Sequence, residues 1–267
     1  MVFPTSLWIL LVVCLVLSSI GFYKFVYFLS VGYGFAVSGV GLAILVLYGS
    51  SLSIWTIAIC ALFIIYGIRL GGFLVLREIK SGSYRKVLAE ATGSGKKIPV
   101  FVKATIWICV SCMYVMQVSP VLYRAVNGDN GNNFAMASAI IMALAIIIET
   151  ISDKQKSAAK KINPKRFCDT GLFKIVRCPN YLGEILFWLG VFVSSFGSLN
   201  SIGQWLVSSI GFVLIVYVML SGAKRLELRQ NNSYGKDPEY IAYVNKTPII
   251  FPLIPLKSLA KIKFIVT

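Results

Sequence analysis

The sequence predicts an all-α, polytopic membrane protein, built as a bundle of about seven transmembrane helices. Hydrophobic residues make up 57% of the 267-residue chain and charged residues only 13%, whereas soluble globular domains carry about 25% charged residues. The mean hydropathy is +0.80. Because the bilayer core offers no hydrogen-bond partner to an exposed backbone, closely packed helices are the expected form of such a chain.

Seven apolar segments approach the roughly 20 residues that a helix needs to cross a membrane. In chain order they are about 6–22, 26–48, 51–76, 99–123, 134–150, 184–199 and 202–221. The first lacks a basic flank and is followed by further spans, so we expect a retained helix and not a cleaved signal peptide. We expect one membrane domain, in which 1–98 holds the N-terminal helices with a basic loop and 99–267 holds the C-terminal helices with a cytosolic tail.

The first four spans carry mostly packing signals. The second contains GYGFAVSGVG, whose glycines allow neighbouring helices to approach closely. The third ends in YGIRLGGFLVLRE, which places Tyr66 and Arg69 on one helix face. The fourth contains Cys109 and Cys112 without a second cysteine pair, which favours packing over a metal site. The chain has no histidine, which excludes histidine metal sites, Ser-His triads and a histidine general acid.

The basic residues predict the orientation of the chain. Of its 26 lysines and arginines, only Arg124 falls on the far side of the seven-span topology. The positive-inside rule then places the N-terminus outside and the C-terminus in the cytosol. A net charge of +16 would suggest nucleic acid in a soluble protein. Here the charge lies in loops between apolar spans, so we attribute it to topology and to attraction for anionic lipid and an anionic cofactor, with no nucleic-acid partner.

The strongest functional signal is GLFKIVRCPNYLGEILFWLG at 171–190, where a basic loop enters the sixth span. Pro179 suits the first position of a helix, and it would place Asn180 and Glu184 one turn apart with Tyr181 beside them. The helix N-terminus and Arg177 would then form an anion site, in which the guanidinium binds a phosphate. The alternative needs no ligand, because a glutamate near a helix N-terminus stabilises the helix by about 0.3–1 kcal/mol.

Two further polar groups flank this segment. Glu149 and Asp153 lie one turn apart at the end of the fifth span, where a carboxylate accepts hydrogen bonds from a ribose or an amide, or simply pairs with a nearby lysine. The tail combines positive charge with aromatic rings, which suits either an adenine and its phosphates or a lipid head-group surface. Its candidate residues are Arg225, Arg229, Tyr234, Tyr240 and Tyr243. The stretch TPIIFPLIP is too short to span and is expected to pack against the bundle.

Three motifs together resemble the steroid 5-alpha-reductase and sterol delta-14-reductase superfamily, and above all its broadly distributed reductase-like branch. They are ISDKQK, TGLFKIVRCPNYLGEILFWLG and YGKDPEYIAYVNKTPIIFP, and the resemblance covers roughly 150–255, with a weaker match at 60–85. It implies an NADPH-dependent oxidoreductase acting on CH–CH groups, which transfers hydride to a conjugated C=C bond of a steroid, sterol or polyprenoid-like lipid. It also implies a helix bundle that the cofactor enters from the cytosolic side.

The resemblance implies roles for particular residues. The cofactor pocket would contain Asp153, Arg166, Arg177, Asn180, Tyr181, Glu184, Arg229 and Tyr243. Tyr66 and Tyr181 would be the catalytic tyrosines, with Tyr66 polarising the substrate. Sterol-reductase relatives usually have histidine where this chain has Cys178, whereas steroid-reductase relatives vary there, so the cysteine weakens the case for a proton donor at this position. A tyrosine, whose reference pKa of about 10 keeps it protonated, is the available neutral donor.

Two other functions remain open. Membrane methyltransferases that use S-adenosylmethionine, of the isoprenylcysteine or phospholipid type, look similar over an R-H-P-x-Y motif and a tail with Arg-x-x-Glu-Glu and then Tyr-x-x-Tyr before a proline. Here Cys178 replaces their histidine and Glu227 is followed by Leu228 instead of a second glutamate, while PNYLGE and DKQK favour the reductase. A sterol-binding protein without catalysis is the third possibility. In each case the expected partners are a lipid and the membrane, of the endoplasmic reticulum in a eukaryote or the cytoplasmic membrane in a bacterium.

Overall fold

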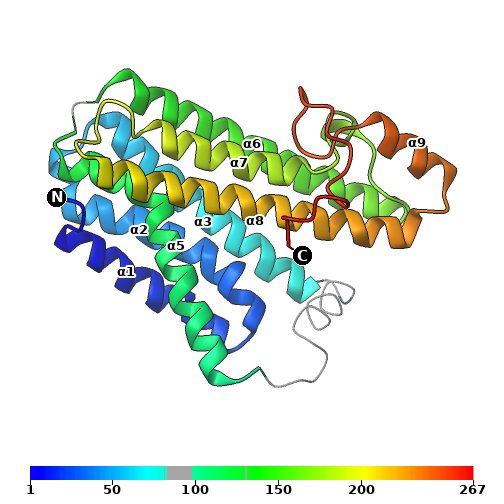
Figure 1. Ribbon diagram of the computed structural model, residues 1–267, viewed down its shortest axis with the longest axis horizontal. Helices are drawn as coiled ribbons and strands as arrows, with labels where there is room; N and C mark the ends of the chain where they lie inside the picture. The colour runs from blue at the N-terminus through cyan, green and yellow to red at the C-terminus, as the bar shows by residue number, and fades with distance from the viewer. Residues whose placement is uncertain (81, 83–97, 130, 267) are drawn as a thin grey trace. The chain divides into compact units, whose positions relative to one another are not determined.

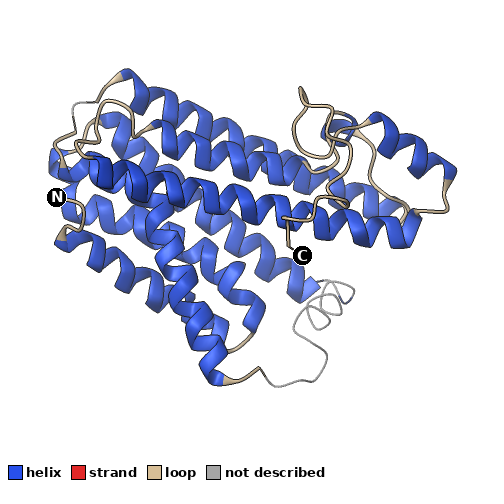
Figure 2. Cartoon of the chain, viewed as in Figure 1, coloured by secondary structure: helices blue, strands red, loops and turns tan. Residues whose placement is uncertain are grey.

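A computed structural model describes residues 1–80, 82, 98–129 and 131–266 of the chain. The described residues form eight α-helices joined by short 3₁₀ turns and loops, and no strand occurs among them (Figure 2). This confirms the predicted all-α class. Most of the basic loop expected after the third span, including Arg85, Lys86, Lys96 and Lys97, lies outside the described residues.

Six of the described helices are long and apolar enough to cross a membrane. The α-helices in chain order are α1 (Thr5–Ser18), α2 (Val31–Tyr48), α3 (Ile54–Lys80), α5 (Val100–Val126), α6 (Asn133–Ile162), α7 (Pro179–Val193), α8 (Ile202–Tyr234) and α9 (Pro238–Lys246) (Figure 1). All except α7 and the polar α9 reach spanning length. Helix α1 does so together with the 3₁₀ turn that follows it, and α2 together with the 3₁₀ turns on either side of it. The protein is therefore an integral, multi-pass membrane protein.

The sixth predicted span, α7, is shorter than the others. Its 15 residues extend over about 22 Å, whereas the hydrocarbon core is about 30 Å thick. It starts at Pro179 and ends at Val193, where the serine- and glycine-containing sequence SSFGS turns the backbone. In that turn Gly197 adopts a positive φ of 72°, a conformation that favours glycine. The orientation with the N-terminus outside depends on α7 as a crossing and stays a prediction.

Two helices extend well beyond their predicted apolar spans. Helix α6 continues to Ile162 instead of ending near 150, and α8 continues to Tyr234 instead of ending near 221. The extra turns are rich in lysine, arginine, glutamate, glutamine and alanine, which favour helix, and contain no proline. Hydropathy alone missed these turns because they are polar. They place Asp153 and Glu227 on rigid helices.

The chain forms two compact units. The first comprises Met1–Ala139 and Gly190–Phe212, and the second comprises Ile140–Leu189 and Val213–Thr267. Helices α6, α7 and α8 each contribute residues to both units. Each unit is described by itself below.

In the first unit, helices α2 and α3 pack closely through glycines. A Cβ atom placed on Gly67 would lie 2.2 Å from the carbonyl oxygen of Gly34 and 2.7 Å from the Cβ of Ser38. A Cβ on Gly39 would lie 2.2 Å from a methyl carbon of Leu17 on α1. The glycines of the second span therefore serve close helix packing, as their pattern predicted.

Arg124, which the sequence marked only as a basic residue on the far side, is fully buried in the first unit. Its Nη1 pairs with Asp129 Oδ1 at 3.1 Å, and its Nη2 donates to Asn132 Oδ1 at 2.9 Å. Its Nε and Nη2 also donate to the carbonyl oxygen of Ser194, at 3.1 and 2.8 Å. A buried charge persists only with such partners. Arg124 therefore holds together the end of α5, the residue before α6 and the turn after α7.

Asp129 should make the stability of the first unit sensitive to acid. Burial raises its pKa, but hydrogen bonds from Thr56, Ser53 and Gly131 outweigh burial and lower it from 3.8 to about 2. Because the folded pKa lies below the unfolded one, the stabilisation is present above about pH 4 and is lost as the pH falls toward about 2. We expect the melting temperature of Asp129→Asn to fall less than that of the wild type between about pH 5 and 2.5. Parallel curves for the two proteins would contradict this.

Candidate functional site

In the second unit, the tail fixes the start of α7. The backbone N–H of Arg177 donates to the carbonyl oxygen of Pro248, and that of Cys178 donates to Ile249, each at 2.9 Å. The side chains of Ile249 and Ile250 are fully buried. The first part of the TPIIFPLIP stretch therefore packs against the helices, as its length predicted, whereas Leu253 and Ile254 in its second part are exposed. Helix α7 then begins at Pro179, a residue that suits the first helical turn.

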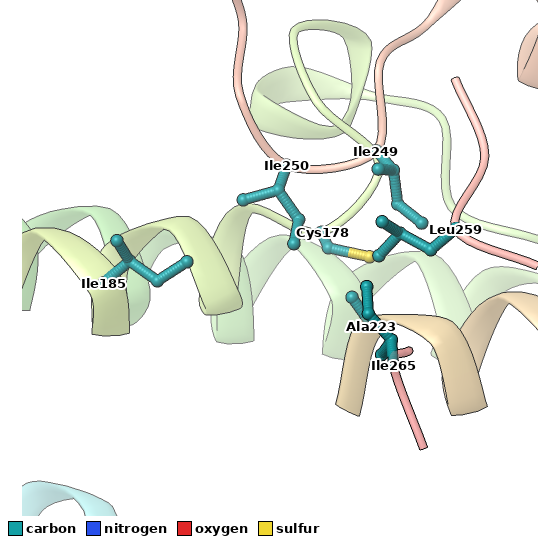
Figure 3. Packing of buried hydrophobic residues seen from close by; sticks show 7 residues of the cluster. All are labelled: Cys178, Ile185, Ala223, Ile249, Ile250, Leu259 and Ile265. Carbon is teal, nitrogen blue, oxygen red and sulfur yellow. The ribbon is translucent and has the colours of Figure 1, made fainter. Parts of the chain in front are cut away.

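Cys178 belongs to an apolar cluster formed by α7, α8 and the tail (Figure 3). The cluster consists of Cys178, Ile185, Ala223, Ile249, Ile250, Leu259 and Ile265. Burial raises the pKa of the Cys178 thiol to about 12, and this effect outweighs the nearby positive charges of Lys156 and Arg177. The thiol is therefore neutral at physiological pH and serves packing.

Asn180 and Asp153 meet between α7 and α6. The amide Nδ2 of Asn180 donates to Asp153 Oδ1 at 2.6 Å, and both residues are half-buried. One turn before Asp153, Glu149 is only 4% exposed, and it lies over Gly183. A Cβ on Gly183 would come within 2.4 Å of Glu149 Cγ. The glycine of the PNYLGE motif therefore makes room for a second carboxylate beside the Asn180–Asp153 hydrogen bond.

Tyr181 and Glu184 complete this group on the first turns of α7. Glu184 is 6% exposed and accepts a hydrogen bond of 2.9 Å from Trp188 Nε1, one turn further along the helix. The half-buried ring of Tyr181 lies on α8 at Gly222, where an added Cβ would be 3.2 Å from the ring and its hydroxyl. Asp153, Asn180, Tyr181 and Glu184 were all predicted as site residues, and they lie together at the junction of α6, α7 and α8. We call this group, with Glu149, the α7 polar cluster.

Arg177 differs from its predicted open position. Its side chain is buried, and its Nη2 donates to Glu227 Oε1 at 3.0 Å and to the carbonyl oxygen of Lys257. The cause lies far away in the sequence, because the polar extension of α8 brings a carboxylate opposite the guanidinium and the tail covers both. The Nε and Nη1 atoms are buried and make no well-formed hydrogen bond among the described residues, although the hydroxyl of Tyr240 lies near the guanidinium.

Glu227 is the residue that sequence reasoning missed. It is 1% exposed, and its Oε2 accepts a hydrogen bond of 2.8 Å from the backbone N–H of Leu259. In the sequence, Glu227 was considered only because Leu228 follows it, where the methyltransferase motif has a second glutamate. No local signal connects it to Arg177. Its buried position links α8 both to the start of α7 and to the tail.

The other predicted cofactor residues lie around α9 and the end of α8. Arg166 is exposed and pairs with Glu239 on α9 and with Asp169, and these carboxylates raise its pKa. The hydroxyl of Tyr243 donates to the carbonyl oxygen of Phe173 at 2.7 Å. Arg166 and Tyr243 both contact the ring of Phe167, at 5.0 and 5.3 Å from its centroid. Arg229 lies exposed on α8.

Tyr66, the predicted substrate-polarising tyrosine, belongs to the first unit. It is fully buried on α3, and its hydroxyl donates to the hydroxyl of Tyr33 at 3.4 Å. The two rings meet edge to face, with their centroids 6.3 Å apart.

Positive charge surrounds the α7 polar cluster along the chain. The end of α6 and the loop to α7 carry Lys154, Lys156, Lys160, Lys161, Lys165, Arg166, Lys174 and Arg177. The only acidic residues of that segment are Asp153 and Asp169. Such a density of cations beside a helix N-terminus attracts an anionic ligand.

Residues 15–247 of the chain match the family described as "Protein of unknown function (DUF1295)". This range contains all of the predicted site residues. No curated protein and no solved structure matches the chain. Because the match covers most of its length, the chain belongs to the DUF1295 family.

Proposed function

We propose that the protein is an NADPH-dependent membrane reductase of the steroid 5-alpha-reductase type, which transfers hydride to a conjugated C=C bond of a steroid, sterol or polyprenoid-like lipid. The observation that supports this most is the hydrogen bond between Asn180 and Asp153, which lies beside the buried Glu149 and Glu184. Amide and carboxylate groups of this kind bind the carboxamide and ribose hydroxyls of a dinucleotide. They lie where apolar helices meet a lysine-rich segment.

The residues present fit such a cofactor. Asn180, Asp153 and Glu184 provide one amide and two acceptors for the nicotinamide riboside. Arg177 provides buried donors at Nε and Nη1 that make no well-formed hydrogen bond among the described residues, and each is a suitable donor to a separate phosphate oxygen. Lys156 adds positive charge close to Cys178 and the start of α7. When bound, NADPH would supply the hydride for the reduction.

The chain itself would stabilise the charge that develops on the lipid and provide the proton. Negative charge on an enolate oxygen needs a preorganised hydrogen-bond donor. The tyrosine hydroxyls of Tyr66 and Tyr181 are neutral donors of this kind. The apolar helices would keep water away from the reacting groups.

Ligand stabilisation separates this proposal from its main rival. We expect NADPH to raise the melting temperature of the purified full-length protein in detergent, since a ligand at 100 times its Kd adds about 2.7 kcal/mol. S-adenosylmethionine at the same concentration should have no effect. Stabilisation by S-adenosylmethionine alone would favour the methyltransferase. Stabilisation by neither ligand would contradict both enzymes.

Asn180→Ala tests the site directly. Removing the amide should raise the Kd for NADPH by up to about tenfold, the effect of losing one hydrogen bond worth about 1.4 kcal/mol. The variant also loses the hydrogen bond to Asp153, so a modest fall in the melting temperature without ligand is expected as well, and the site is tested by the Kd of the folded protein. The matched control is Asn232→Ala, the same substitution at an exposed position of α8. Equal NADPH affinity in the two variants would refute the site assignment.

A further inference from the structure

Helix α5 in the first unit presents one buried stripe that contains an unsatisfied amide. Tyr114, Gln117, Val121 and Arg124 follow the spacing i, i+3, i+7, i+10 and are each at most 2% exposed. The hydroxyl of Tyr114 donates to the carbonyl oxygen of Phe28. Arg124 has the partners described above. Gln117 lies between Tyr114 and Arg124 in the stripe, and its side-chain amide has no hydrogen-bond partner among the described residues.

Both polar atoms of the Gln117 side chain are buried, and neither Oε1 nor Nε2 has a hydrogen-bond partner among the described residues. A buried amide without partners costs free energy, and native proteins rarely tolerate one. Within a membrane span the cost is especially hard to avoid, because lipid cannot provide a partner. The arrangement therefore points to a group from outside the chain.

The surroundings indicate what kind of group this is. Tyr114, one turn away, packs its ring 5.0 Å from that of Tyr33, which in turn meets Tyr66. The neighbouring residues Val118 and Val121 are fully buried and apolar. Arg124 is the cation of the stripe, but its guanidinium is engaged by Asp129, Asn132 and Ser194. An anionic ligand would find no free charge there, so the ligand should be neutral.

The amide also selects the type of oxygen. Its Nε2 can donate and its Oε1 can accept, so the complementary group must do both. A ketone only accepts and would leave Oε1 unsatisfied, whereas a hydroxyl satisfies both atoms. We infer that Gln117 binds the hydroxyl of a neutral, otherwise apolar lipid in the interior of the first unit. This inference stands apart from the proposed reductase activity and requires no cofactor.

The first unit offers a matched control in Gln204, a second buried glutamine. Its Oε1 accepts hydrogen bonds from Asn127 Nδ2 and from the backbone N–H of Asn200, both at 2.9 Å. Its Nε2 donates to the carbonyl oxygen of Met1 at 3.1 Å and to Asn127 Oδ1 at 3.2 Å. Methionine has a similar volume and no amide. Gln117→Met removes an unsatisfied amide, whereas Gln204→Met removes a satisfied one.

The test measures lipid binding to the purified full-length protein in nanodiscs without NADPH. Three pairs of probes are used: a 3β-hydroxysterol, a polyprenol and a long-chain fatty alcohol, each with its deoxygenated counterpart. We expect the wild type to bind at least one alcohol about tenfold more tightly than its counterpart, from the two hydrogen bonds to the hydroxyl. Gln117→Met should lose this preference without a lower melting temperature. Gln204→Met should keep the preference and melt at a lower temperature.

Two results would overturn the inference. One is a wild type that shows no preference for the alcohol in any of the three pairs. The other is a Gln117→Met protein that retains the preference, which would mean that a group other than Gln117 binds the hydroxyl. Since no cofactor is present, neither result bears on the reductase proposal, and a failure to bind NADPH leaves this inference untouched.

Discussion

Replacing Glu227 with alanine is expected to lower the free energy of unfolding by about 3–5 kcal/mol, the usual cost of removing one partner of a buried ion pair. Arg177 would remain charged, because a guanidinium does not lose its proton in a protein. Its side chain is 1% exposed, and its Nη2 would keep only the carbonyl oxygen of Lys257. The backbone N–H of Leu259 would also lose its acceptor.

Unfolding curves of the purified protein measure this cost, and two further variants define its origin. Arg177→Met combined with Glu227→Leu should recover most of the stability, because removing both charges leaves no unpaired ion in the interior. Glu239→Ala removes the carboxylate of an exposed pair with Arg166 and should change stability little. If Glu227→Ala and Glu239→Ala behaved alike, the Arg177–Glu227 pair would not be buried.

The same ion pair determines how the tail is held. Arg177 binds the backbone of Lys257, and Glu227 binds that of Leu259. Three residues earlier on α8, Lys224 donates to the carbonyl oxygens of Ile262 and Ile265, at 3.0 and 2.9 Å. The tail therefore contacts charged side chains of α8, and its own residues Ile249, Leu259 and Ile265 are buried. Losing Glu227 should free this segment as well as destabilise the unit.

The parts of the fold that could be predicted follow from local composition. Apolar segments of sufficient length predicted the helices, and the glycines of GYGFAVSGVG predicted the close packing of α2. Within the α7 polar cluster, the spacing in PNYLGE predicted that Asn180, Tyr181 and Glu184 lie together, because helix geometry alone fixes them. Asp153 was predicted as a site residue from the ISDKQK motif, and the structure shows that it accepts a hydrogen bond from Asn180.

What could not be predicted depends on partners distant in the sequence. Arg177 faces inward because Glu227 lies opposite it, and no pattern near either residue shows this pairing. Arg124 was counted only as a topological charge, although Asp129 and the carbonyl oxygen of Ser194 hold it in the interior. Gln117 was hidden in an apolar span, where one amide barely changes the hydropathy. Whether such a residue is satisfied depends on three-dimensional contacts, which composition does not contain.

The tyrosines should give the largest effect on activity. If the protein reduces a conjugated lipid as proposed, Tyr66→Phe should lower kcat by about 10²–10⁴, the range for loss of a general acid. Its affinity for NADPH should be unchanged, because the proposed cofactor residues are on other helices. The hydroxyl of Tyr66 donates a hydrogen bond of 3.4 Å to Tyr33, so the melting temperature of the variant is measured alongside its rate. Single-turnover measurements with an enone lipid and NADPH would measure the rate.

Tyr181→Phe should differ from Tyr66→Phe in its affinity for NADPH, and this difference separates a cofactor-binding tyrosine from one that acts only on the lipid. Tyr181 follows Asn180 directly in the α7 polar cluster, so losing its hydroxyl should weaken NADPH binding as well as turnover. Tyr123→Phe is the matched control, because Tyr123 is a buried tyrosine of α5 whose hydroxyl donates to the carbonyl oxygen of Val2 at 2.8 Å. It should keep the wild-type kcat and lose some stability. Wild-type rates in both Tyr66→Phe and Tyr181→Phe would mean that the proton comes from another group, since the chain has no histidine to provide it.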